Sequence, residues 1–508
     1  MEKTIIIIGA GIAGLAAGCY GQMNGFRTKI YELHELPGGL CTAWDRKDYT
    51  FDGCIHYLYG SAAGKPFNHV WEELGTIQDC QIINHEELIQ VIAPDGKKLI
   101  AYCDPDRWEE HLLQLSAKDH KASRRLAQGV RNFLDFDMSL IVEKPRELMG
   151  LGDWMRLGLQ MMPFLGTTAR YGLLDARDMA NQFTDPFIQR AFPHLFAWPK
   201  IPMIAALATL AYMHTGNAGF PVGGSLAFAR RLEKRYLDMG GEIHYKSQVQ
   251  KILVKKGKAV GVRLYSDEEI QAEAVISTAD GRGTIYELLE GEFTNHKIDS
   301  LYAEGNLPVL SQLLVSYGVR RDLTKEPYWA TYLLEQPLII AGRAFSEIGV
   351  KHYCFDPSLA PPGHSVIEIM LPTSYDYWKS IYGRKLYDTE QNQVAEQLLE
   401  FLESIYPGIH EDVEVVDVAT PLSYERYTEN WLGSTCGWLL TKKTMTMMIT
   451  GMRKTLPRLQ NFYLAGQWVE PGGGLALAAY SGRNAIRLIC QADGIAFTTD
   501  ARQIGAAT

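Results

Sequence analysis

Three closely spaced glycines near the N-terminus offer a place for a phosphate group. Gly9, Gly11 and Gly14 follow the apolar run at residues 4–8 and open a stretch of small, apolar residues with helical character. A strand that turns into a helix in this way directs backbone N–H groups and the positive helix end toward a pyrophosphate. Gly9 permits the turn, Gly11 leaves space for phosphate, and Gly14 lets the helix pack closely on the strand. The spacing predicts a dinucleotide site.

Glu32 supplies the second part of this site. It ends the next short strand, 18 residues after Gly14, where a carboxylate can accept hydrogen bonds from both ribose hydroxyls. A carboxylate in that place repels a 2′-phosphate, so NADP is disfavoured and NAD and FAD stay open. The later Gly281-Arg282-Gly283 run lacks a third glycine and a following acid, so it does not indicate a second dinucleotide domain.

The elements that must position these residues recur in separated parts of the chain. Strand and helix patterns typical of an α/β fold occupy three stretches, and two insertions interrupt them. Residues 76–214 are predicted as a helical, substrate- or membrane-facing insert, and residues 296–450 as a substrate domain with a mixed sheet and helices. We therefore expect one nucleotide-binding domain built from residues 1–75, 215–295 and 451–495, with a tail at 496–508.

Composition excludes several classes of protein. The 508 residues are 46% hydrophobic and 21% charged, with a net charge of -9, and basic runs no longer than pairs do not favour nucleic acid. The eight cysteines form no C-x-x-C pair and no zinc-type cluster, so we expect no metal and reduced thiols. The longest apolar run, 201–213, is shorter than the ~20 residues of a membrane span. With no signal-peptide pattern at the N-terminus, we expect a cytoplasmic protein.

The motifs together resemble the FAD-dependent phytoene desaturase, carotenoid isomerase and retinol saturase family. The matching stretches include IIIIGAGIAGLAAG, FDGCIHY, PVGGSLAFARRLEKRYLDMGG and LAGQWVEPGGGLALAAY, whereas residues 104–215 match poorly. The resemblance implies FAD as cofactor. It also implies a Rossmann-type, glutathione-reductase-like FAD-binding domain with the inserted substrate domain described above.

The resemblance also assigns cofactor contacts. In the family the first glycines and the acid bind the adenosine end of FAD, which carries over to Gly9, Gly11, Gly14 and Glu32. Further contacts are implied for Gly38 and Gly39, for the Val249 backbone at adenine, for Gly466 and Gln467 at the ribityl chain and phosphate, and for Gly473 and Gly474 beside the isoalloxazine. Many relatives carry an acid where this chain has Gln467. A helix from residue 475 would direct its positive end at the flavin.

Three side chains are candidates for catalysis. His56 stands where carotenoid desaturases usually have an apolar residue, and a histidine with a pKa near neutral can deliver a proton to carbon. Tyr57 can orient His56 or bind a polar group of the substrate. Glu470 precedes the Pro-Gly-Gly-Gly turn, where relatives often have histidine. The alternatives are a structural His56 held by backbone hydrogen bonds and a Glu470 that faces solvent.

The helical insert offers material for an apolar chamber. The runs LGDWMRLGLQMMPFLG and LFAWPKIPMIAALATLAYM are rich in Met, Trp, Leu and Phe. As a hypothesis, residues 154–164 lie on a membrane surface and admit a lipid-soluble substrate; an ordinary capping domain is the alternative.

We expect an FAD-dependent oxidoreductase that desaturates, saturates or isomerises carbon–carbon bonds of a long isoprenoid, carotenoid, retinoid or related lipid. One alternative is an amine-oxidase-like enzyme acting on C–N bonds, and another is a redox-inactive FAD-binding scaffold. The sequence leaves open the substrate, the direction of the reaction, the electron donor or acceptor and the oligomeric state.

Overall fold

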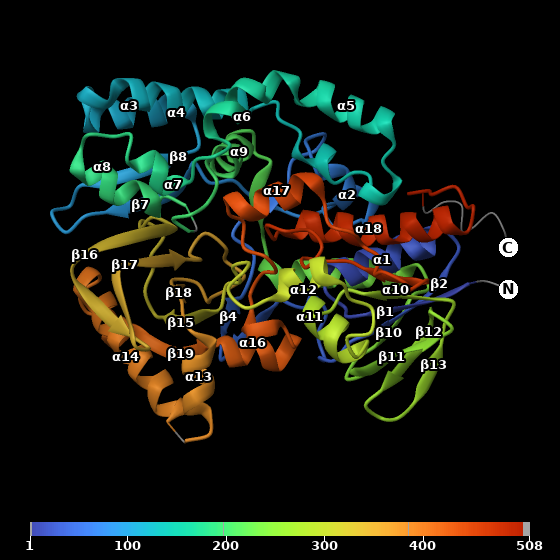
Figure 1. Cartoon of the computed structure of the whole chain (residues 1–508). Helices are drawn as coiled ribbons and strands as arrows, with labels where there is room; N and C mark the ends of the chain where they lie inside the picture. Colours follow the sequence, from blue (N-terminus) through green and yellow to red (C-terminus); the bar gives the residue numbers. More distant parts are fainter. Residues whose placement is uncertain (1–2, 197, 385, 501–508) are drawn as a thin grey trace.

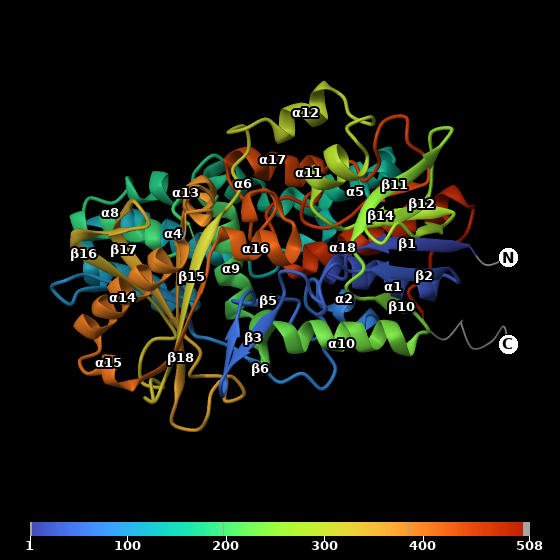
Figure 2. The ribbon, with the colours of Figure 1, turned by 90° about the horizontal axis from the view of Figure 1, so that it is seen from below.

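The computed structural model describes residues 3–196, 198–384 and 386–500. A nucleotide-binding region and a substrate region lie side by side, and both chain ends lie at the nucleotide-binding end of the molecule (Figures 1 and 2). Each region is built around its own sheet. Helices of the insert run along the top of the molecule in Figure 1.

A parallel five-stranded sheet forms the centre of the nucleotide-binding region. Its order is β10-β2-β1-β14-β20, so strands from the three predicted segments become neighbours. The central strands are buried apolar runs, as expected for a sheet covered on both faces. The strands are β1 (Thr4–Ile8), β2 (Arg27–Tyr31), β10 (Glu242–His244), β14 (Ala274–Ser277) and β20 (Phe462–Leu464).

Three helices cover one face of this sheet. Helix α1 packs against both α10 and α18. The contact with α18 is close enough that a Cβ on Gly482 would lie 2.2 Å from the Ala13 carbonyl oxygen. The helices are α1 (Ile12–Met23), α10 (Gly224–Asp238) and α18 (Leu475–Ala492). The first and last predicted segments are thereby joined into one layer.

A small antiparallel sheet packs on the other face, in the core formed by Ile6, Ile8 and Val275 with Val262. Its first two strands meet at Lys256 and Gly257, which both have positive φ, as a tight hairpin turn requires. The strands are β11 (Val249–Lys255), β12 (Lys258–Leu264) and β13 (Glu269–Gln271).

The substrate region contains a mixed seven-stranded sheet of order β19-β15-β18-β17-β16-β7-β8. Helices α13 (Tyr375–Tyr382) and α14 (Tyr387–Ile405) bury their apolar side chains against it. Its strands are β7 (Glu87–Ile92), β8 (Lys98–Tyr102), β15 (Gln312–Val319), β16 (Trp329–Ile340), β17 (Arg343–His352), β18 (Ser365–Pro372) and β19 (Val413–Ala419).

The first part of the predicted helical insert is in fact a hairpin of this sheet. β7 pairs in parallel with β16 and antiparallel with β8, although both β7 and β8 fall within residues 76–214. The run ELIQVI and the turn at Pro94-Asp95-Gly96 have the β-branched and turn residues of such a hairpin. The predicted domain boundaries themselves stay a prediction.

The rest of the insert is helical, as the sequence predicts, and forms a cap over both regions (Figure 1). None of the helices in the described ranges combines the length and apolar character that a bilayer-spanning segment needs. The cap contains α3 (Pro105–Leu115), α4 (His120–Asn132), α5 (Leu151–Met161), α6 (Leu165–Tyr171), α7 (Ala176–Ala180), α8 (Pro186–Ala191) and α9 (Met203–His214).

Short elements connect these regions. They are β3 (Ala43–Arg46), β4 (Tyr49–Asp52), β5 (Leu58–Tyr59), α2 (Asn68–Glu73), β6 (Ile82–Ile83), β9 (Ala218–Pro221), α11 (Gly281–Gly283), α12 (His296–Tyr302), α15 (Ile409–Asp412), α16 (Pro421–Thr428) and α17 (Lys442–Thr450). Part of the predicted tail is anchored, because Thr498 exchanges backbone hydrogen bonds of 2.8 and 2.9 Å with the Asn24 side chain. Residues 501–508 of that tail lie outside the described part of the chain.

Candidate active site

A large cavity lies where the nucleotide-binding region, the substrate sheet and the helical cap meet. Its volume is about 1550 Å³, which exceeds the roughly 300–1,000 Å³ of ordinary small-molecule pockets. Glycines of the predicted dinucleotide motif, strands β17 and β18, and residues of α5 and α9 all contribute to its wall. The cavity therefore has room for a dinucleotide and a second molecule.

The first end of the cavity is made by the N-terminal glycines. Gly9, Gly11, Gly38 and Gly39 line it, and a Cβ on Gly39 would lie 3.4 Å from the Gly11 Cα. Gly11 caps α1 without a side chain, and the first turn of the helix has no acidic residue. The N–H groups at this helix end can therefore receive a phosphate. Gly14 allows α1 to pack closely on the preceding turn, because a Cβ at this position would lie only 1.9 Å from the Gly9 carbonyl oxygen.

Glu32 lies at the same end of the cavity, directly after β2. Its Oε2 accepts a hydrogen bond of 2.6 Å from the Ala10 N–H, and its Oε1 accepts one of 2.8 Å from the His34 N–H. Burial raises the pKa of Glu32, and backbone N–H groups oppose the rise. The carboxylate has more acceptor sites than these backbone donors use, so it can also accept a hydrogen bond from a ribose hydroxyl. Val249 is buried at the start of β11 and is not among the described lining residues, so its backbone contact stays a prediction.

The second end of the cavity is formed by the C-terminal glycine turn. Gly466, Gln467, Gly473 and Gly474 line it, as do residues 475–478 in the first turn of α18. Gly473 and Gly474 have φ values of 69° and 105°, which favour glycine. This long helix again starts at a glycine and has no acid in its first turn. Two positive helix ends thus face one cavity, an arrangement that fits the pyrophosphate and the pyrimidine carbonyl of the FAD ring.

His56 and Tyr57 both line the cavity. His56 Nδ1 lies 2.9 Å from Lys351 Nζ, and the His56 ring centroid lies 5.0 Å from that of Trp329. Burial and the Lys351 charge hold the pKa of His56 well below its usual value, so the near-neutral pKa expected from sequence is corrected. Burial raises the pKa of Tyr57, which therefore stays a neutral phenol. The structure places these two candidates together.

Glu470 lies elsewhere. It is buried in an ion pair with Lys454 and is not among the described residues that line the cavity. A buried carboxylate needs a partner of opposite charge, and Lys454 provides it. This position argues against the catalytic role suggested by the sequence and also against its solvent-facing alternative.

Two cavity residues, Lys351 and Glu368, are not found by the sequence reasoning. They are register partners on β17 and β18, and each is only 1% exposed. Lys351 Nζ donates to the Tyr353 hydroxyl at 2.9 Å, and Glu368 Oε1 accepts from the Asp52 N–H at 3.1 Å. Burial lowers the pKa of Lys351 and raises that of Glu368. The sequence could have indicated both residues, because each is a single charged residue within a mostly apolar run, GVKHY for Lys351 and SVIEIMLP for Glu368.

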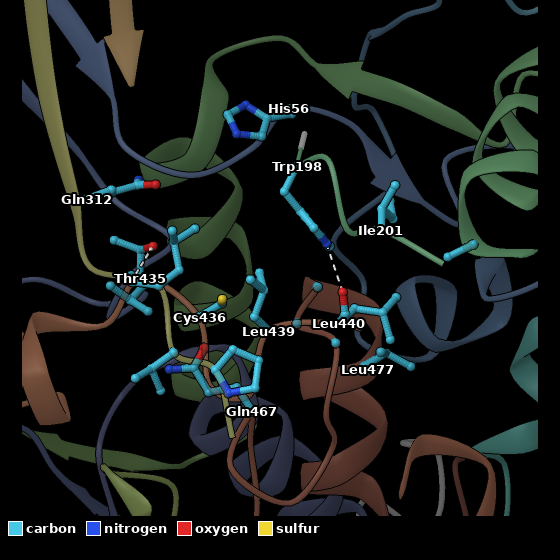
Figure 3. Close-up of a pocket in the computed structure, with 18 of the residues that line it drawn as sticks. His56, Trp198, Ile201, Gln312, Thr435, Cys436, Leu439, Leu440, Gln467 and Leu477 are labelled. Carbon is cyan, nitrogen blue, oxygen red and sulfur yellow. Dashed lines mark hydrogen bonds between the residues drawn. The ribbon is translucent and has the colours of Figure 1, made fainter. Parts of the chain in front are cut away.

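The remaining wall is mostly apolar. In Figure 3 His56 and Gln467 lie at the top and bottom of the view, with Trp198 and Leu439 between them. The Trp198 indole N–H donates to the Leu440 carbonyl at 2.8 Å, which holds the ring in place. Apolar lining residues from the cap are Phe136, Met138, Ile141, Leu157, Met161, Leu165, Ile201 and Ile204. No group of three or more possible metal ligands is found within the described ranges.

The fold and the two glycine-lined cavity ends define a flavoprotein oxidoreductase. A family profile described as flavin containing amine oxidoreductase matches residues 12–490, and the chain belongs to this family. The predicted FAD cofactor, fold class and enzyme class are confirmed.

Relatives extend along nearly the whole chain. It is 28% identical over 506 residues to prolycopene isomerase 1, chloroplastic, of Oncidium hybrid cultivar, covering 95% of this chain and 82% of that protein. It is 24% identical to the lycopene-forming phytoene desaturase of Pseudescherichia vulneris, covering 94% and 96%. It is 23% identical to all-trans-retinol 13,14-reductase of Danio rerio, covering 91% and 82%. The predicted family resemblance is thereby confirmed.

Solved structures share the fold. An oxidoreductase from Methanosarcina mazei has a TM-score of 0.59 at 18% identity, covering 95% of this chain and 100% of that one. A putrescine oxidase variant has a TM-score of 0.62 at 12% identity, covering 97% and 99%.

Proposed function

We propose that this enzyme uses FAD to act on carbon–carbon double bonds of a long isoprenoid, such as a carotenoid or retinoid. The observation that carries the proposal is the continuity of one cavity from the cofactor-binding glycines to the apolar wall of the cap. Relatives named as a prolycopene isomerase, a phytoene desaturase and a retinol reductase support this substrate class.

The residues of the chain have separable tasks in such a reaction. When bound, FAD supplies the exchange of a hydride with a substrate carbon. The N-terminus of α18 would stabilise negative charge on a flavin held beside the glycine turn, which leaves space for the ring. The apolar cap residues exclude water and bind the hydrocarbon by contact, and Trp198 keeps a fixed orientation through Leu440.

The experiment is anaerobic incubation of the purified holoprotein with a panel of carotenoids, retinoids and unsaturated lipids. Flavin absorbance and product mass are followed together. A gain of two hydrogen atoms indicates saturation, a loss of two indicates desaturation, and an unchanged mass with shifted polyene absorbance indicates isomerisation. Hydrogen peroxide production from amines, without change in any polyene, would instead favour the C–N alternative. A photoreduced protein that neither oxygen, quinones nor lipids reoxidise would favour the scaffold alternative.

The same proposal includes peripheral contact with a membrane through α5. Leu151, Met155 and Leu159 repeat every fourth residue on one helix face and are 80%, 62% and 64% exposed. Leu157 and Met161 of the same helix line the cavity. The helix therefore separates the apolar cavity from an exposed apolar surface, a position suited to admitting a lipid-soluble substrate.

Flotation with phosphatidylcholine–phosphatidylglycerol vesicles tests this contact. The double variant Met155→Glu/Leu159→Glu should reduce the vesicle-bound fraction at least ~10-fold, because two charges replace apolar side chains at the surface. Ile339→Glu, at a 58% exposed site on β16, is the matched control and should float like the parent. A parent protein that stays with the buffer would remove the membrane proposal and leave the reaction untouched.

A further inference from the structure

The hydrogen bonds of Lys351 determine which nitrogen of His56 carries the proton. Lys351 Nζ lies 2.9 Å from His56 Nδ1, 2.9 Å from the Tyr353 hydroxyl and 3.3 Å from the Ile55 carbonyl oxygen. These three partners match the three protons of an ammonium, which donates and cannot accept. His56 Nδ1 is then an acceptor, and the ring proton lies on Nε2.

The surroundings of Lys351 favour its charged form. Its Nζ lies 4.2 Å from the centroid of the Tyr353 ring and 5.7 Å from that of Trp329, within the range of cation–π attraction. Burial is the main cause that lowers the pKa of Lys351, to about 8, and the acidic groups of Glu368, its register partner, and Asp52 oppose it. At neutral pH Lys351 is therefore an ammonium next to His56.

The Nε2 side of His56 is left for a substrate. The ring belongs to the cavity wall, and within residues 3–196, 198–384 and 386–500 no hydrogen bond to Nε2 is found. Figure 3 shows His56 at the edge of the space that Trp198 and Leu439 also enter. A neutral imidazole held in this way presents an N–H donor to a molecule in the cavity.

We propose that Lys351 and His56 form a proton relay that gives a proton to a substrate carbon. This inference rests on the proposed function and extends it by assigning the direction of proton transfer. The Nε2–H bond breaks, and the electron pair of the substrate double bond forms a new C–H bond. A Lys351 N–H bond breaks and a Nδ1–H bond forms, so the imidazole stays neutral. In a net reduction the second carbon takes its hydride from the two-electron-reduced flavin.

The relay resets when solvent returns one proton. Lys351 recovers its proton from Nδ1, and Nε2 receives the new one, which restores the original tautomer. The opposite direction is disfavoured, because removing a proton from a substrate carbon needs a free lone pair on Nε2. That state places a proton on Nδ1 against the Lys351 ammonium. In saturation the added proton stays on carbon. In isomerisation by protonation it returns to Nε2 after rotation about the bond, and Nδ1 gives its proton back to the Lys351 amine. The resting pair is thus built to begin a reaction by donating a proton, and not to begin a desaturation by removing one.

The charges that face the pair come from several elements. Lys351 lies on β17 and Glu368 on β18; Asp52 lies at the end of β4. Asp52 and Glu368 both act to raise the pKa of Lys351, whereas Lys351 lowers the pKa of His56. His56 is therefore expected to stay neutral and to keep this tautomer from about pH 5 to about pH 7, across the usual imidazole pKa and below the pKa of about 8 of Lys351.

The first test is nitrogen NMR of the holoenzyme labelled with ¹⁵N-histidine. The His56 signals are identified by their loss in His56→Gln. We expect a pyridine-type Nδ1 and a pyrrole-type Nε2 that do not titrate over that range. Lys351→Met should remove the preference for the Nε2–H tautomer and raise the pKa of His56. The double variant Lys351→Met/Glu368→Gln offers the same test without an unpaired buried acid. A wild-type proton on Nδ1 would overturn the relay.

The second test separates the charge of Lys351 from its ability to release a proton. Lys351→Arg keeps a donor to Nδ1 but does not deprotonate, so it should preserve the tautomer while lowering kcat by about 10²-fold or more. His111→Gln is the matched control, because burial also lowers the pKa of His111, which lies on α3 and is not among the described lining residues. It should leave the rate unchanged.

Deuterium from heavy water should enter the product at carbon, and the rate of its entry should fall in His56→Gln. Desaturation as the catalysed direction, or full activity in Lys351→Arg, would overturn the relay and leave the proposed substrate class standing. Failure to convert any polyene would instead overturn the proposed function. The tautomer measurement would still decide whether Lys351 locks His56.

Discussion

Gly11 and Gly14 are three residues apart, yet the structure predicts opposite consequences for replacing each by alanine. A Cβ on Gly14 would lie 1.9 Å from the Gly9 carbonyl oxygen and 2.9 Å from Thr278 Oγ1. The backbone oxygen cannot move without separating α1 from β1. A Cβ on Gly11 meets only the Gly38 carbonyl oxygen, at 3.8 Å, and Gly11 has a φ of −65°, which any residue adopts.

The expected magnitudes differ accordingly. Gly14→Ala gains about 1 kcal/mol of helix propensity, and overpacking of a close contact costs up to about 3 kcal/mol. We expect a net loss of about 2 kcal/mol in the free energy of unfolding. Gly11→Ala should change stability by less than about 1 kcal/mol. Its methyl group lies on the cavity wall, however, where the pyrophosphate must approach the backbone, so the Kd for FAD should rise at least ~10-fold, or about 1.4 kcal/mol.

Two assays distinguish these effects. Urea unfolding of the cofactor-free proteins, followed by circular dichroism, measures stability, and titration with FAD, followed by flavin fluorescence, measures affinity. The reasoning is refuted if Gly11→Ala binds FAD as tightly as the parent. It is equally refuted if Gly14→Ala unfolds at the same urea concentration as the parent.

Other perturbations probe single contacts. Glu32→Gln should raise the Kd for FAD by about 10- to 100-fold in the same titration, because charged hydrogen bonds contribute about 1.5–3 kcal/mol; unchanged affinity would remove Glu32 from the ribose site. Lys454→Met should cost about 3–5 kcal/mol in urea unfolding by leaving Glu470 buried and unpaired, while the spectrum of bound flavin stays unchanged; a shifted spectrum would contradict the separation of this pair from the cavity. Burial raises the pKa of Asp280 from 3.8 to about 6. Its protonated form is therefore favoured by folding, and the unfolding free energy should fall by about 3 kcal/mol as pH rises from about 4 to about 6. Asp280→Asn should lack this part of the slope, and equal slopes would show that burial does not shift Asp280.

The nucleotide-binding half was predictable because its signals are local. Gly9, Gly11 and Gly14 act within one turn, and Glu32 follows at a spacing fixed by one helix and one strand. The C-terminal glycines carry the same kind of information, since backbone with positive φ favours glycine. Residues whose role is decided by their own backbone conformation can be found without the tertiary structure.

The substrate half was less predictable because its contacts are remote in sequence. Lys351 and His56 are separated by almost 300 residues, and only the packing of β17 against the segment after β4 brings them together. Glu470 is the converse case, a residue that is close to the site in sequence but not in space. It lies next to the C-terminal glycine turn in sequence, but it is paired with Lys454 and is not among the described residues that line the cavity.

The order of strands β10-β2-β1-β14-β20 has a consequence for synthesis of the chain. Helix α1 leaves the ribosome long before α18 (Leu475–Ala492), the helix that packs on it. The face of α1 that α18 covers therefore stays uncovered until the intervening segments have been synthesised. Such long-range closure slows folding and exposes intermediates to aggregation. We therefore expect the yield of this protein to rise with chaperone supply.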